Sequence, residues 1–168
     1  AGITPVPISV NQSQRLFFRS SYLKDLTNLL EKYGVSAKWI TLEILEGLAM
    51  ENADELNEKI KKLQAVGFKV SMDDFGSGYS SLNTLGSLNI DELKLDREFL
   101  LEISGEKGER FRTIMEQIGN MTKCLRISTV VEGVETPENE RLIKALDCDY
   151  GQGYYYSRPI PAAEFSKS

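Results

Sequence analysis

The sequence predicts an α/β fold in which parallel strands alternate with helices. Two patterns indicate this class: short apolar runs recur along the chain, and longer amphipathic stretches separate them. The length bounds the number of domains, because 168 residues with 41% hydrophobic content can bury one core but hardly two. We therefore expect a single domain.

The candidate strands are the short apolar runs, which follow one another at residues 6–10, 39–44, 68–72, 92–95, 127–131 and 150–155. The helices expected between them are residues 22–33, 53–65, 80–85, 109–122 and 137–145. Pro137 suits the first turn of the last of these helices, because that position needs no amide hydrogen. Residues 104–108 are the most loop-like stretch, and we expect them to form a connection inside the domain.

The most informative run follows the third candidate strand and reads Asp73-Asp74-Phe75-Gly76-Ser77-Gly78-Tyr79-Ser80-Ser81-Leu82. Adjacent carboxylates repel each other, and oxygen ligands favour hard divalent cations such as Mg²⁺ or Mn²⁺, so this pair predicts a metal site. The glycines allow a sharp turn, and Ser80-Ser81 are placed to cap the next helix. The structural alternative is an acidic turn that only caps a helix.

Composition excludes several classes of function. The chain has no histidine, which rules out a Ser-His-Asp triad and a histidine-liganded zinc, and its two cysteines are too few for a disulfide framework. The formal net charge of −5 makes bulk DNA or RNA an improbable partner. No apolar stretch reaches the roughly 20 residues that span a bilayer, and no secretory signal pattern is present. We expect a cytoplasmic location, with membrane tethering left open for a longer parent protein.

Each candidate strand ends in, or runs directly into, polar side chains that could carry chemistry. In a barrel of alternating strands and helices, the carboxyl ends of the strands share one face, and that face carries the active site. Any one of these residues could instead be a solvated strand end, but six strands with the same feature favour a shared site. The residues are Asn11, Glu43, Asp73 with Asp74, Lys94 with Asp96, Glu132 with Glu135, and Gln152.

These motifs resemble the EAL domains, phosphodiesterases that open the bacterial second messenger cyclic di-GMP, and the resemblance covers essentially the whole chain. The matching segments are Ser9-Val10-Asn11-Gln12-Ser13, Leu42-Glu43-Ile44-Leu45-Glu46, the Asp73 to Leu82 run, Leu93-Lys94-Leu95-Asp96, Val131-Glu132-Gly133-Val134-Glu135-Thr136 and Gln152-Gly153-Tyr154. This resemblance implies a (β/α)8 TIM-like barrel, here incomplete with about six of its eight strands.

The resemblance also implies hydrolysis of cyclic di-GMP to linear pGpG with two Mg²⁺ or Mn²⁺ ions. Two cations about 3.5–4 Å apart suit an in-line displacement at phosphorus. The implied metal ligands are Asn11, Glu43, Asp73, Asp74 and Glu132, with Asp73 bridging the two ions.

Further roles are implied for polar residues around these ligands. Lys94 would orient or help deprotonate the attacking water, although a lysine at a strand end can also be a structural residue that extends its ammonium toward solvent. Gln152 and Asp96 would lie next to the substrate and the metals. Glu135 would support the catalytic site from behind the ligands, and Glu46 would brace the loop after Asp74.

Three departures from the family pattern stand out. The Glu-Ala-Leu motif that names the family is missing, and Ala1 to Pro7 lead directly into what resembles its third strand. We therefore interpret residues 1–168 as an EAL domain truncated on its N-terminal side. An unclosed sheet exposes strand edges, which predicts a homodimer formed by edge pairing.

The other two departures are substitutions. Leu45 and Gly47 stand where threonine and serine are common in the family, which puts control of the catalytic loop in question. Val131 stands where alanine is common, which is a mild packing change.

Three functional hypotheses remain from the sequence. The first is a cyclic di-GMP phosphodiesterase, the second is a receptor that binds cyclic di-GMP without cleaving it, and the third is an inactive fragment. Retention of Lys94 and of both Asp73 and Asp74 favours the enzyme, because a receptor needs neither. A neighbouring sensory or GGDEF-type domain in the parent protein fits all three hypotheses.

Overall fold

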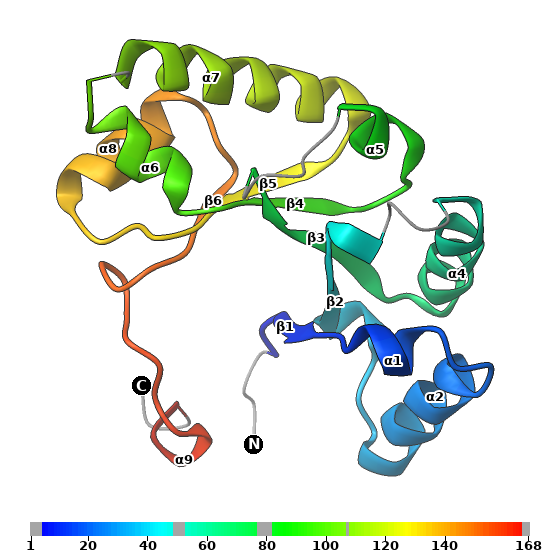
Figure 1. Ribbon diagram of the computed structural model, residues 1–168. Coiled ribbons are helices and arrows are strands. Elements are labelled where there is room, and N and C mark those ends of the chain that lie inside the picture. The colour runs from blue at the N-terminus through cyan, green and yellow to red at the C-terminus, as the bar shows by residue number, and fades with distance from the viewer. Residues whose placement is uncertain (1–4, 49–52, 77–81, 107, 166–168) are drawn as a thin grey trace.

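The computed structural model describes residues 5–48, 53–76, 82–106 and 108–165. Its strands form one curved parallel sheet in which each strand pairs with the next along the chain, in the order β1-β2-β3-β4-β5-β6 (Figure 1). The strands are β1 (Ile8–Asn11), β2 (Ile40–Leu45), β3 (Lys69–Phe75), β4 (Glu92–Leu95), β5 (Ser128–Val131) and β6 (Tyr150–Gly151). The predicted α/β fold of six parallel strands is confirmed, and the sheet has the form of an incomplete barrel.

Helices connect successive strands and lie on the outer side of the curved sheet, except the last helix, which follows β6 near the C-terminus (Figure 1). They are α1 (Gln14–Phe17), α2 (Tyr22–Tyr33), the 3₁₀ helix η1 (Ala37–Trp39), α4 (Ala53–Val66), α5 (Leu82–Ser87), α6 (Glu98–Ile103), α7 (Gly108–Leu125), α8 (Pro137–Ala145) and α9 (Ala162–Phe165). Among the described residues, no helix has the length and apolarity needed to cross a membrane.

Side chains alternate along each strand between the helix-covered face and the concave face of the sheet. On β4, Leu93 and Leu95 are fully buried in the hydrophobic core, whereas Glu92 and Lys94 line a pocket on the concave face. The outward apolar residues of β2, β3 and β5 belong to the same core, and Leu56, Ile60 and Leu63 of α4 close over it. The period of two is the geometric property of a strand that separates core residues from site residues.

Helix boundaries follow local chemistry. At α8, the Thr136 side chain accepts a hydrogen bond from the Asn139 amide, and the Asn139 side chain accepts one from the Thr136 amide, which forms a reciprocal cap. Pro137 occupies the first turn, as predicted. At its C-terminal end, α2 is capped by Gly34, whose φ of 64° is left-handed and therefore suits glycine.

Most predicted elements are confirmed, and α2, α8 and β4 have the predicted bounds. The strand predicted at residues 150–155 is wrong beyond Gly151, because Tyr154 to Tyr156 form a turn that brings the chain back over the end of β5. Short helices α1, α6 and α9 were not predicted, since four to six residues are too few to show helical periodicity. The proposed helix cap at Ser80 and Ser81 lies outside the described residues.

Two aspartates tie neighbouring strands together at the amino end of the sheet. Asp91, just before β4, accepts hydrogen bonds from the Val70 amide (2.8 Å) and from the Gln64 side chain (3.0 Å). Asp149, just before β6, accepts from the amide (2.8 Å) and hydroxyl (3.0 Å) of Thr129, which is 1% exposed. These bonds fix strand register at the end opposite to the polar site.

We expect Asp149→Ala to lower the free energy of unfolding by about 2 kcal/mol, because the buried Thr129 amide and hydroxyl then lose their acceptor. Asp149→Asn keeps one acceptor oxygen and should cost less. Chemical denaturation followed by circular dichroism measures both, with Glu58→Ala on the exposed face of α4 as a neutral control. Equal stability of Asp149→Ala and the wild type would show that the Asp149–Thr129 pair does not fix the strand.

Candidate functional site

The register of the sheet brings polar residues from separate strands to the same end of the sheet. Asn11 on β1 lies opposite Glu43 on β2, and Asp73 lies two residues beyond the residue that pairs with Glu43 on β3. Glu132 directly follows β5, and its amide donates to the Leu95 carbonyl at the end of β4. Side chains that are far apart in the sequence thus meet at the carboxyl ends of the strands.

One ammonium group lies at the centre of these acids. Lys94 Nζ is 3.0 Å from Glu43 Oε1 and 2.9 Å from Asp73 Oδ1. It is also 2.6 Å from Glu132 Oε1. Lys94 is only 4% exposed, and Glu43 and Asp73 are buried as well, so these ion pairs are shielded from water.

Asp74 adds a fourth carboxylate to the site. Oxygen atoms of Asp73, Asp74 and Glu132 lie within 4.8 Å of one another, close enough to share a metal ion. Asp74 has a left-handed backbone with φ of 58°, a conformation that aspartate tolerates better than most residues, and its amide donates to Asp73 Oδ1 at 3.1 Å. Because all three groups offer carboxylate oxygens, the donor set fits a hard cation such as Mg²⁺ or Mn²⁺.

The pKa values of the cluster reflect its excess of negative charge. Burial raises the pKa of Glu132, and the hydrogen bond from Lys94 offsets this only in part. Burial and the neighbouring Asp73 carboxylate raise the pKa of Asp74. For Lys94 burial acts to lower the pKa, but the hydrogen bonds to its three carboxylate partners, with Glu132 first, outweigh burial and raise it. The ammonium therefore stays charged.

The remaining predicted residues lie around this cluster. Gln152 Nε2 donates to Glu132 Oε1 at 3.3 Å, which joins β6 to the site. Asp96 accepts a 2.7 Å hydrogen bond from the Glu98 amide at the start of α6, and its charge contributes to the raised pKa of Asp74. Gln152 and Asp96 thus both interact with carboxylates of the cluster.

The three other predicted residues lie on β1, just beyond β2 and at the entry to α8. Asn11 is exposed on the edge strand β1, and Glu46 is buried at 4% exposure just beyond β2. Glu135 is exposed where the chain enters α8, with its amide donating to Asn139. Of the two departures in this region, Leu45 is half exposed, and Val131 is fully buried in the core.

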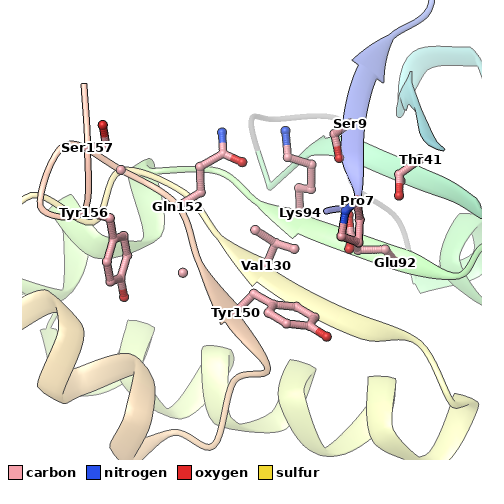
Figure 2. A pocket seen from close by; sticks show the side chains of 12 residues that line it. Pro7, Ser9, Thr41, Glu92, Lys94, Val130, Tyr150, Gln152, Tyr156 and Ser157 are labelled. Atoms are coloured by element: carbon pink, nitrogen blue, oxygen red, sulfur yellow. The ribbon is translucent and has the colours of Figure 1, made fainter. Parts of the chain in front are cut away.

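The sequence did not single out one wall of the concave face, which is formed by residues two positions before the predicted site residues. Ser9, Thr41, Glu92, Val130 and Tyr150 line a pocket of about 480 Å³ together with Lys94 and Gln152. Figure 2 shows these side chains on the concave side of the sheet, with Lys94 directed toward the carboxyl ends of the strands. The alternation of residues along each strand is the signal that could have identified this wall, since each lies an even number of positions from a predicted site residue of its own strand.

Three glycines allow the loops of the rim to come close together. A Cβ at Gly153 would lie 2.1 Å from the Val134 carbonyl oxygen, and a Cβ at Gly76 would lie 2.1 Å from the Phe99 ring. Gly133, next to Glu132, has φ of 71° and packs against Arg97. The rim therefore depends on the absence of side chains at these positions.

Comparison with known proteins agrees with this geometry. The sequence model of the EAL domain matches residues 2–159. The chain belongs to the EAL domain family. Among curated relatives of this EAL chain, the cyclic di-GMP phosphodiesterase NbdA of Pseudomonas aeruginosa is 36% identical over 163 residues, which cover 97% of the chain and 21% of NbdA. The chain spans about a fifth of the length of this relative.

Solved EAL structures share the fold. The PaMucR phosphodiesterase in complex with c-di-GMP superimposes with a TM-score of 0.86 at 33% identity, covering 95% of this chain and 64% of PaMucR. The Klebsiella pneumoniae BlrP1 complex with manganese and cyclic di-GMP gives a TM-score of 0.81 at 27% identity, covering 91% of this chain and 39% of BlrP1. The EAL relatives thus include proteins solved with the dinucleotide and with a divalent metal.

Without divalent cations, we expect the wild type to lose stability relative to Asp74→Asn as the pH rises from about 4, the ordinary range of carboxylates. The raised pKa of Asp74 means that the folded state binds this proton more tightly than the unfolded state. Its contribution is therefore present below the unfolded-state pKa and is lost as the pH rises through the folded-state pKa.

Denaturant unfolding in EDTA at a series of pH values measures this difference. Asparagine also tolerates the left-handed backbone at position 74, so the variant is a matched control. Saturating Mn²⁺ should abolish the loss, since it stabilises the ionised carboxylates. Parallel pH curves for the two proteins in EDTA would contradict a crowded acidic site.

Proposed function

We propose that this EAL domain hydrolyses cyclic di-GMP to linear pGpG with the help of two Mg²⁺ or Mn²⁺ ions. The observation that carries the proposal is the cluster of Glu43, Asp73, Asp74 and Glu132 around Lys94, at the carboxyl ends of parallel strands. The family membership supports the substrate, because relatives with the same fold are named for this activity or were solved with this dinucleotide.

The carboxylates would hold the cations, with Asp73 between the two ions and Asn11 contributing an amide oxygen from β1. When bound, such ions supply electrostatic stabilisation of the developing charge on the phosphate and lower the pKa of water. Lys94 would orient the attacking water and assist loss of its proton. Gln152, which already contacts Glu132, would hold that carboxylate in place at the substrate-facing edge of the site.

The other polar residues would keep the loops in order. The Asp96 side chain accepts a hydrogen bond from the Glu98 amide at the start of α6, and its negative charge acts on Asp74. Glu46 would brace the loop after Asp74 from its buried position, and Glu135 would support Glu132 from the entry to α8.

We also propose that the chain forms a homodimer through the edges of its sheet. Within the described residues the sheet order runs from β1 to β6 without pairing these two strands to each other. Ile8 and Val10 on β1 are 53% and 43% exposed, and the apolar groove beside them is lined by leucines of α2. Open edges with apolar side chains favour association.

A neighbouring sensory or GGDEF-type domain in the parent protein would regulate the site. The relative MucR is named a bifunctional diguanylate cyclase/cyclic di-GMP phosphodiesterase, so that protein combines this activity with a second one. We place the activity in the cytoplasm. The two free cysteines, Cys124 and Cys148, suit a reducing compartment.

Incubation with cyclic di-GMP and Mn²⁺ tests the activity, with formation of pGpG followed by chromatography. We expect turnover by the wild type and a loss of about a hundredfold or more in Asp73→Asn, because this variant removes one ligand charge and one partner of Lys94. The matched control is Asp54→Asn on the exposed side of α4, which should retain full turnover. Binding of cyclic di-GMP without turnover would instead indicate a receptor.

Light scattering coupled to size-exclusion chromatography tests the dimer. The wild type should elute with about twice the mass of the 18.9 kDa chain, and Val10→Lys should shift it to the monomer, because a charge on the edge opposes pairing. Leu101→Lys, on the exposed surface of α6, serves as the control. A wild-type monomer at high concentration would contradict the proposal.

A further inference from the structure

The hydrogen-bonding capacity of Lys94 is fully used within the described site. An ammonium group has three N–H donors. Lys94 Nζ faces three carboxylate oxygens, those of Glu43, Asp73 and Glu132, at 3.0, 2.9 and 2.6 Å. In this arrangement the ammonium has no donor left for a water molecule or a phosphate oxygen.

The same contacts place Lys94 where a divalent cation would bind. Its partners Asp73 and Glu132 also belong to the group whose oxygens converge within 4.8 Å. With Asp74 and Glu43, the cluster has four carboxylates for one ammonium, and its buried members have little water to screen their repulsion. One positive charge therefore compensates the cluster only partly.

We propose that Lys94 is an exchangeable internal counter-ion that holds the carboxylates together in the metal-free protein and withdraws from them when divalent cations bind. Withdrawal frees its N–H donors for the water or phosphate oxygen of the reaction, a step that rests on the proposed function. The exchange itself rests only on the ion pairs and can be tested without substrate.

The proposal predicts the sign of two effects. Removal of the ammonium should destabilise the metal-free protein, because the carboxylates lose their only cation among the described neighbours. It should also tighten binding of Mn²⁺, because the metal no longer competes with a fixed positive charge. A residue that merely shapes the site would produce the opposite second effect, since a poorly shaped site binds metal more weakly.

Isothermal titration with Mn²⁺, together with thermal unfolding in EDTA, tests both effects in Lys94→Met. We expect Mn²⁺ to bind about tenfold more tightly than to the wild type, and the melting temperature in EDTA to fall. Lys94→Arg keeps the charge and should stay within about threefold of the wild-type affinity. Lys123→Met removes an ion-paired surface lysine and should change neither quantity. Equal or weaker Mn²⁺ binding by Lys94→Met would overturn the proposal.

A measurement on the wild type decides the case if Lys94→Met does not fold. In protein labelled with ¹⁵N-lysine, a buried ammonium that donates three hydrogen bonds should give a protected NMR signal in EDTA, assigned by its absence in Lys94→Arg. Saturating Mg²⁺ should shift or broaden this signal beyond detection. A signal that persists unchanged at saturation would refute the exchange. Because neither measurement needs cyclic di-GMP, a failure here is distinct from a lack of phosphodiesterase activity.

Discussion

The structure depends on the concentration of negative charge at the carboxyl ends of its strands. Glu43, Asp73, Asp74 and Glu132 come from three strands or the residues directly after them, and one ammonium, that of Lys94, lies among them. Such an arrangement is unfavourable without a cation, since each carboxylate raises the free energy of its ionised neighbours. The cluster therefore costs stability in the metal-free protein, and its oxygens lie close enough together to share a metal ion.

The parallel sheet brings these charged residues together. Because every strand runs in the same direction and pairs with its sequence neighbour, residues at equivalent positions of successive strands converge at one edge. The alternation of side chains lets one strand both pack the core and line the site, with Leu93 and Leu95 of β4 in the core and Lys94 in the site. The aspartate bonds at the amino end and the close glycine contacts at the rim hold that register from both sides.

The fold and the main acids could be predicted because their signals are local. Apolar runs mark β2 to β5, and the Asp73-Asp74 pair stands out beside a buried strand. The short helices α1, α6 and α9 could not, since their residues are helical through contacts with the rest of the fold rather than through periodicity. Nor could the distances around Lys94 be predicted: they depend on register across three pairs of strands, whereas motifs show only that the residues exist.

Diffraction from crystals soaked in Mn²⁺, with anomalous scattering to locate the metal, tests both the metal site and the displacement of Lys94. We expect manganese within about 2.0–2.6 Å of carboxylate oxygens of Asp73, Asp74 and Glu132, and Lys94 Nζ farther from these oxygens than in the metal-free state. Manganese bound only elsewhere, or an unchanged Lys94 with all three ion pairs intact beside a bound metal, would contradict this expectation.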